Sequence, residues 1–227
     1  MTTTYTINFQ NKRGADSNYA VFMEPPVLSI SGTSPDAFMN VWYSTFVPNN
    51  GYFDIKTGVD YYAWVVTATA KPAPGVMVNT GMSLPARLGQ GTTAGDTFNM
   101  VIKRNFPTIA QSTPSAVASA YEINTGTDFP VPNERYLIGL GKVNNRGLVA
   151  PVASTNPFNN MKIQLTPKMK FYILESIFEA GVIVDYQSVT REAAVIDFTL
   201  GKGAGKFYAV VTQDDTGKFT VQYFDNY

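Results

Sequence analysis

The chain has 227 residues, 44% of them hydrophobic and 15% charged, and its 17 basic and 17 acidic side chains give a formal net charge of zero. This length suits one large β domain, and the lack of a basic excess argues against nucleic acid as a partner, because phosphate neutralisation supplies most of the affinity of such proteins. Cysteine and histidine are both absent, which excludes disulfides, thiolate nucleophiles, the Ser-His-Asp triad and histidine-ligated metals.

Residues 4–10 alternate between apolar and polar residues with a period of two, which predicts a strand. A second strand is predicted at 19–23, before Pro25 and Pro26, and we expect these two strands to form a hairpin through the polar segment between them. Further strands are predicted at 38–46 and 59–70. The Pro-Asn-Asn-Gly segment at 48–51 is typical of a turn, because Asn and Gly tolerate positive φ.

The middle of the chain is the least regular part. A strand is predicted at 96–106, but residues 105–160 are rich in Pro, Asn and Ser and contain one clear strand pattern, at 135–143. We interpret the region 105–160 as long irregular loops around a few strands, or as an insertion. It does not resemble a separate domain.

Segments rich in aromatic and β-branched residues return in the last third and predict strands at 161–167, 169–178, 181–189, 193–200, 206–213 and 218–224. One of them also fits a helical stripe through Phe171, Leu174, Ile177 and Phe178, but its strand-like neighbours favour a strand. The whole pattern predicts an all-β fold, an antiparallel β-sandwich of jelly-roll-like or similar type, in one domain over residues 1–227.

Residues 201–206, Gly-Lys-Gly-Ala-Gly-Lys, invite comparison with loops that bind phosphate. A P-loop needs Gly-x-x-x-x-Gly-Lys-Ser/Thr, and aligning Gly205 and Lys206 places Leu200 and Phe207 at the two other required positions. Predicted strands flank the segment on both sides, whereas a P-loop precedes a helix. We therefore interpret these residues as a hairpin turn and expect no bound cofactor.

Asp214 and Asp215 are the best candidates for binding calcium. A calcium loop of the EF-hand type needs acidic residues at alternating positions and a distal Glu, and this segment has neither. Asp near Gly at a strand reversal is ordinary turn chemistry, so no metal site is expected.

Glu175 and Glu179 are the best pair for carboxylate catalysis. On one strand, positions i and i+4 lie about 13 Å apart, whereas the two carboxyl groups of glycosidases lie roughly 5–9.5 Å apart. The same spacing on a helix would bring the two carboxylates close. Acids distant in sequence, such as Glu122 and Glu134, could converge only through the fold. We therefore expect no catalytic residue.

Aromatic side chains that could stack on a sugar occur at Trp42, Tyr43, Tyr61, Tyr62 and Trp64. Strand alternation places Tyr62 and Trp64 on one face, which is typical of core packing. The aromatic residues predicted in loops, Tyr52, Phe129 and Phe158, are expected to be exposed and to serve contacts between molecules.

Several segments near the two ends share a strand and turn pattern with a known family; they lie at 7–11, 19–26, 41–46, 61–65, 170–198 and 212–223. In these segments the chain resembles the family of the rhizosphere-expressed protein of rhizobia, small bacterial and fungal proteins. The resemblance covers about half of the chain and departs in the middle region. It implies an all-β fold and supports a strand at 170–176, and it brings no catalytic residues.

The zero net charge, the many strand edges and the long loops favour a non-enzymatic function. We expect a structural or self-assembling protein that forms homo-oligomers or, at the extreme, dense inclusions or crystals. The alternative is a carbohydrate-binding or other recognition module that uses loop aromatics, and a histidine-free enzyme comes third. Because neither a signal peptide nor a run of roughly 20 apolar residues is visible, we expect an intracellular protein, with export without a signal as the alternative.

Overall fold

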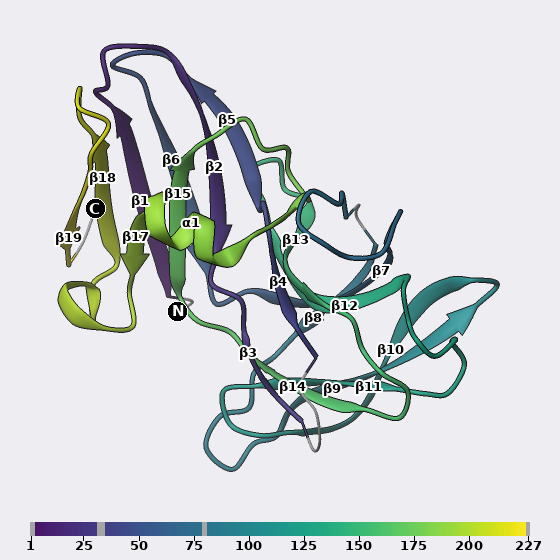
Figure 1. The fold of residues 1–227 in the computed structure, drawn as a ribbon. Coiled ribbons are helices and arrows are strands. Elements are labelled where there is room, and N and C mark those ends of the chain that lie inside the picture. The colour runs from purple at the N-terminus through teal and green to yellow at the C-terminus, as the bar shows by residue number, and fades with distance from the viewer. Residues whose placement is uncertain (1–2, 31–34, 79–80, 226–227) are drawn as a thin grey trace.

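Strands dominate the structure, a computed structural model that describes residues 3–30, 35–78 and 81–225 (Figure 1). The described strands form four sheets, and the helical segments among them are short, namely α1 (Tyr186–Glu192) and the 3-10 turn η1 (Gly201–Gly203). The prediction of an all-β, sandwich-like fold is confirmed. A β-sandwich of the predicted type has two sheets, whereas the described strands divide among four.

Two four-stranded sheets contain strands from both ends of the chain. The first has the order β19 (Phe219–Phe224), β18 (Tyr208–Gln213), β1 (Thr4–Asn11), β6 (Tyr52–Gly58). The second has the order β17 (Ala194–Asp197), β15 (Lys170–Glu175), β2 (Ser17–Met23), β5 (Tyr43–Val47). The sheets pack face to face, with ring centroids 4.3 Å apart for Phe9 and Tyr19 and 5.8 Å apart for Tyr43 and Phe53.

The other two sheets come mainly from the middle of the chain. The five-stranded sheet has the order β10 (Phe106–Ala116), β9 (Gly95–Lys103), β11 (Tyr121–Thr125), β14 (Lys162–Thr166), β3 (Val27–Ser29). The six-stranded sheet has the order β16 (Ile183–Val184), β4 (Ala37–Asn40), β13 (Val149–Thr155), β12 (Tyr136–Val143), β7 (Tyr61–Thr67), β8 (Met82–Ala86). The Tyr121 hydroxyl of the first donates 3.0 Å to the Gly139 carbonyl of the second.

One cluster of buried apolar side chains contains residues of all four sheets, among them Ile7, Tyr19, Phe98 and Ile138. The single domain over residues 1–227 stays a prediction. Most strand pairs are antiparallel, as predicted, but β1 pairs with β18 and β9 pairs with β11 in parallel. Parallel partners are far apart in sequence, so local pattern does not reveal them.

The predicted N-terminal hairpin is wrong. β1 lies between β18 and β6, whereas β2 lies between β15 and β5 in the facing sheet. The connection between them therefore crosses from one sheet to the other. The buried Asn11 amide stabilises this crossing, because it donates to the carbonyl oxygens of Ala15 (2.9 Å) and Val47 (3.0 Å).

Residues 105–160 are not the irregular region that we expected, because they contain β10, β11, β12 and β13. β10 escapes the sequence pattern because much of it is exposed and it contains Pro107 and Pro114.

The strand predicted at 181–189 is also wrong beyond its start, because α1 follows β16. Asp185 caps this helix by accepting a 2.8 Å hydrogen bond from the Ser188 N–H, so a local cap overrides strand-like composition.

The strand at Lys170–Glu175 is confirmed, and so is the hairpin turn at 214–218, where the Asp214 N–H donates 3.0 Å to the Lys218 carbonyl. The Gly-rich segment at 201–206 lies between strands, as predicted. It is not a hairpin turn, however, because β17 and β18 belong to facing sheets. Gly203 packs so closely here that a Cβ would lie 2.0 Å from the Asp197 carbonyl oxygen.

Candidate functional site

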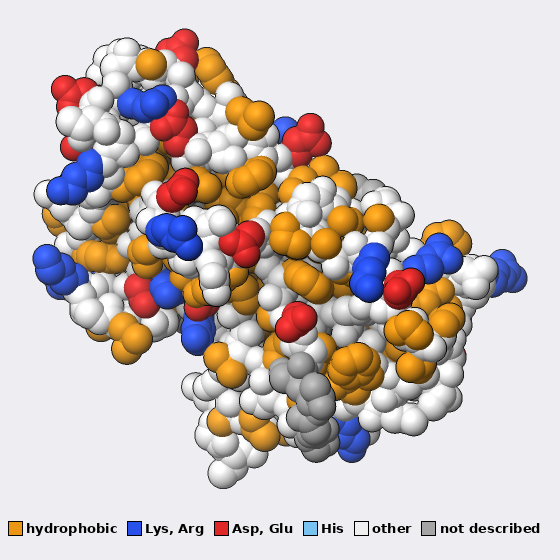
Figure 2. All heavy atoms as spheres, in the orientation of Figure 1, with side chains coloured by type: hydrophobic (Ala, Val, Ile, Leu, Met, Phe, Trp, Pro, Cys, Tyr) orange, Lys and Arg blue, Asp and Glu red, His pale blue; other side chains and the backbone are white. Residues whose placement is uncertain are grey.

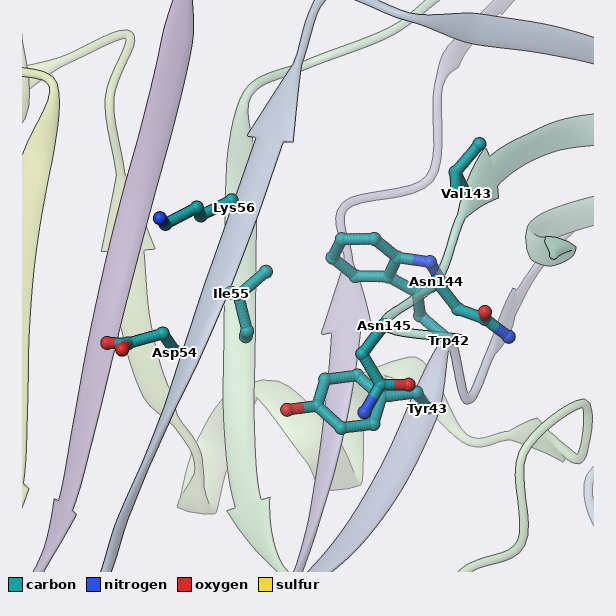
Figure 3. A pocket seen from close by; sticks show the side chains of 8 residues that line it. All are labelled: Trp42, Tyr43, Asp54, Ile55, Lys56, Val143, Asn144 and Asn145. Carbon is teal, nitrogen blue, oxygen red and sulfur yellow. The ribbon is translucent and has the colours of Figure 1, made fainter. Parts of the chain in front are cut away.

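A pocket of about 240 Å³ opens beside β6, where the turn after β12 approaches the first pair of sheets (Figure 3). Its lining combines two aromatic rings, one stretch of β6 and one turn, namely Trp42, Tyr43, Asp54, Ile55, Lys56, Val143, Asn144 and Asn145. Segments distant in sequence therefore build the pocket, which only the folded chain contains.

Trp42 and Tyr43 form the aromatic part of the pocket. Trp42 is only 2% exposed, and its ring stacks on Phe171 at a centroid distance of 6.0 Å. Its buried indole Nε1 has no hydrogen-bond partner among residues 3–30, 35–78 and 81–225. An unpaired buried N–H costs free energy. Trp64 Nε1 is also unpaired, but Trp64 does not line this pocket.

β6 contributes its free edge, since it is the last strand of its sheet. The Asn11 N–H donates 3.0 Å to the Gly51 carbonyl, which fixes the register of β1 and β6. Because antiparallel strands alternate, the peptide groups of Asp54 and Lys56 then face away from β1. Figure 3 shows the side chains of these two residues pointing away from the indole ring. The Asn8 amide donates 2.8 Å to the Asp54 carboxylate and holds it there.

The turn after β12 closes the third side. The side-chain oxygen of Asn144 accepts hydrogen bonds from the N–H groups of Arg146 (2.9 Å) and Leu148 (3.1 Å), which fixes the turn. Asn145 is exposed at the tip, and its side chain lines the pocket. The Asn144 side chain thus stabilises the turn, whereas the Asn145 amide is accessible to a ligand.

A buried lysine anchors this end of β6. Lys142 Nζ donates to the carbonyl oxygens of Gly58 (2.8 Å) and Asp60 (3.2 Å), and it lies 4.6 Å from the centre of the Tyr61 ring. Burial lowers the pKa of Lys142 to about 8. Burial also raises the pKa of Tyr43, with the Asp54 charge as the lesser cause, so the Tyr43 hydroxyl stays neutral in the pocket.

The pocket therefore offers hydrogen-bonding groups beside an apolar wall. Asn145 is exposed, and the peptide groups of Asp54 and Lys56 face outward along the edge of β6. Within the part of the chain that the structure describes, no group of three or more Asp and Glu side chains could hold a metal ion. This chemistry suits binding of an uncharged polar ligand.

Comparison with protein families gives one match. The family model described as RhiA matches residues 2–224, nearly the whole chain. The chain belongs to the RhiA family. The match extends over the middle region, where the resemblance seen in the sequence departs. No curated protein and no solved structure matches this RhiA family member.

The predicted aromatic residues of this RhiA family member divide between core and surface. Trp42, Tyr43, Tyr61 and Trp64 are all buried, so they do not form an exposed stacking face, and Tyr62 is half-buried. Of the aromatics predicted in loops, Tyr52 (69% exposed) and Phe158 (47%) are exposed as predicted, although Tyr52 begins β6, whereas Phe129 is buried. Phe129 is covered because its ring packs against Tyr136 at a centroid distance of 6.0 Å.

The predicted acidic pairs do not make a catalytic constellation in the described residues. Glu175, at the end of β15, accepts hydrogen bonds from the Ser17 hydroxyl (2.8 Å) and the Gln213 amide (3.0 Å), and it pairs with Arg13. Glu179 lies exposed in the following loop. These contacts give Glu175 a structural role in linking the two facing sheets.

The other acids have separate surroundings. Glu122 is buried and accepts hydrogen bonds from the Ser115 hydroxyl (3.1 Å) and the Gln164 amide, whereas exposed Glu134 pairs with Lys71 at 3.6 Å. Asp214 accepts from the Thr216 hydroxyl at 2.6 Å in the turn before β19, and this hydrogen bond is the main cause of its lowered pKa.

Sequence reasoning missed a buried carboxylate at Glu24. Glu24 accepts hydrogen bonds from the hydroxyls of Tyr172 and Tyr186, and Lys170 Nζ lies 3.5 Å away. Burial and, to a lesser degree, the hydrogen bond to Glu24 raise the pKa of Tyr172. In the sequence, Glu24 is recognisable only as a Glu that precedes two prolines after a predicted strand. This pattern does not indicate which residues contact its carboxylate.

In the described residues no helix is long and apolar enough to cross a membrane.

Proposed function

We propose that this protein is a non-enzymatic recognition protein that binds a neutral carbohydrate in the pocket beside Trp42. The observation that carries the proposal is the pocket itself, in which the Trp42 and Tyr43 rings lie beside Ile55 and the exposed Asn145. A sugar there could place its C–H face on the apolar lining and pair its hydroxyl groups with the Asn145 amide.

The chemistry around Trp42 favours a sugar over a charged ligand. Asp54 and Lys56 contribute one negative and one positive side chain to the lining, so the pocket carries no net charge, and both side chains point away from the indole ring (Figure 3). The free peptide groups of the β6 edge and the Asn145 amide offer both donors and acceptors, which match hydroxyl groups. The apolar surfaces of Ile55 and Val143 suit the C–H face of a sugar ring.

The size of the pocket limits the ligand. Its volume of about 240 Å³ is slightly below the roughly 300–1,000 Å³ of sites for drug-sized ligands. We therefore expect it to hold one sugar ring, either a monosaccharide or the end of a longer glycan.

Screening on a glycan array, followed by calorimetric titration of the best glycan, tests the proposal. Asn145→Ala removes the exposed pocket amide and should weaken binding about tenfold, which corresponds to roughly 1.4 kcal/mol. Arg146→Ala changes the next residue of the same turn, which does not line the pocket, and should bind like the original protein. An array without any binding, or equal affinities for the two variants, would reject the proposal.

A second candidate function is the self-association of a structural protein, which rests on the unprotected edge of β19. The two functions are compatible, since the pocket and this edge lie at opposite ends of the same sheet. An intracellular location stays a prediction.

A further inference from the structure

We propose that β19 pairs antiparallel with β19 of a second copy of this chain, so that the two four-stranded sheets join across a two-fold axis at Val221. β19 is the last strand of its sheet and lies at the outer left of the molecule in Figure 1, with β18 as its only backbone ladder partner among the described strands. The Tyr223 side chain also accepts a 2.9 Å hydrogen bond from the Asp197 N–H of β17. This inference is independent of the carbohydrate pocket.

The register shows which peptide groups are available. The hydrogen bond from the Asp214 N–H to the Lys218 carbonyl (3.0 Å) begins the ladder between β18 and β19. Alternation along an antiparallel ladder then directs the peptide groups of Phe219, Val221 and Tyr223 away from β18. A regular edge of three donors and three acceptors thus faces outward.

β19 lacks the features that normally protect an edge strand. Its sequence, Phe-Thr-Val-Gln-Tyr-Phe, contains no charge and no proline, whereas edges are commonly blocked by Lys, Pro or a covering segment. β10 shows the contrast, because it contains Pro107 and Pro114 and its Ile109 N–H donates to Met82 Sδ (3.4 Å).

The opposite edge of the same sheet, β6, is protected in part. Lys142 Nζ donates to the outward carbonyl of Gly58, and the exposed positions of β6 include the charged Asp54 and Lys56. Within this sheet, therefore, β19 is the less protected edge.

The strand is complementary to itself. With the axis at Val221, each Phe219 lies opposite Tyr223 of the second copy on the inner face, and aromatic pairs are favourable across strands. On the solvent face each exposed Thr220 lies opposite Gln222 of the second copy. No like charges are brought together in this register, so nothing in β19 opposes the pairing.

A second copy is the partner that the molecule favours. The formal net charge is zero, and acidic and basic side chains are mixed over the face seen in Figure 2, so copies repel one another weakly. A two-fold contact also closes on itself, because each copy uses its single β19 edge. The product is a dimer with one continuous sheet.

Paired charge variants test both the dimer and its register by sedimentation at several concentrations. The original protein should sediment with twice the mass of one chain at high concentration. Thr220→Lys with Gln222→Lys places two lysines opposite each other twice, and this variant should be monomeric. Thr220→Glu with Gln222→Lys places opposite charges in the same positions and should restore the dimer.

Both variants change exposed side chains, and their circular dichroism should match that of the original protein. An original protein that stays monomeric at every concentration would overturn the proposal. If the double-lysine variant is still a dimer, the contact lies elsewhere. If the glutamate-lysine variant is a monomer, this register is wrong. Either result would also overturn the proposal.

Discussion

Lys142 Nζ donates a 2.8 Å hydrogen bond to the carbonyl oxygen of Gly58, although the lysine is only 2% exposed. The contact joins the end of β12 to the end of β6, the two elements that face each other across the Trp42 pocket. A buried cation thus holds the pocket walls in place without entering the pocket.

The first prediction concerns the effect of Lys142 on the pH dependence of stability. Burial lowers its pKa to about 8, against roughly 10.4 in an unfolded chain. Between these values the unfolded state binds more protons, so the free energy of unfolding rises with pH. We expect the free energy of unfolding, measured by urea denaturation, to rise by roughly 2 kcal/mol between about pH 7 and about pH 9.5.

Lys142→Met should abolish this rise, and the exposed Lys56→Met should retain it. Unfolded tyrosines begin to lose their protons in the upper part of this range, but the original protein and both variants share this contribution. If the original protein and Lys142→Met have the same slope in this range, Lys142 is not the group responsible.

The second prediction concerns the buried carboxylate. Tyr172→Phe removes a hydroxyl that donates to Glu24 and should lower the free energy of unfolding by about 1–3 kcal/mol, because a buried charge loses a hydrogen bond. Tyr52→Phe removes the hydroxyl of an exposed tyrosine and should change the free energy of unfolding by less than about 0.5 kcal/mol. Chemical denaturation of both variants measures these changes. Equal losses of unfolding free energy in the two variants would contradict a role for this cluster in stability.

The third prediction returns to the Gly-rich segment. A Cβ at Gly203 would meet the Asp197 carbonyl oxygen at 2.0 Å, so Gly203→Ala should destabilise the protein by at least roughly 2 kcal/mol. Lys202→Ala, at an exposed position of the same turn, should have almost no effect. Thermal unfolding compares the two, and a neutral Gly203→Ala would show that the turn moves freely.

The fourth prediction uses the absence of cysteine from the chain. In the proposed dimer Val221 lies opposite itself, with Cα atoms about 5.5 Å apart, which a disulfide can bridge. Val221→Cys should therefore form a covalent dimer under mild oxidation, seen on a non-reducing gel. Thr212→Cys, one strand further inside on β18, should stay monomeric, and equal cross-linking of both would indicate random collision.

The sequence predicted the strand class of most segments, because alternation and aromatic content are local properties. It did not predict their partners. β1 and β2 are neighbours along the chain but lie in facing sheets, and the parallel partner of β1 is β18, near the other end. The amide of Asn11, which stabilises that crossing, carries no distinct local signal.

The candidate site was predictable only in part. Trp42 and Tyr43 were recognised as potential sugar contacts but interpreted as core packing; the structure buries both rings, and both also line a pocket. Asn145 and the β6 edge could not be identified, because their role depends on the approach of the turn after β12 to a strand more than eighty residues earlier.

The most direct test of the proposed function uses the fact that the chain has only two tryptophans. In Trp64→Phe, Trp42 is the single fluorophore and reports on the pocket; in Trp42→Phe, Trp64 reports on the core. Both proteins are titrated with glucose, galactose, mannose and N-acetylglucosamine. A saturable change in Trp64→Phe with at least one sugar, absent from Trp42→Phe, is the predicted result, and unchanged fluorescence of Trp64→Phe with all four sugars would contradict it.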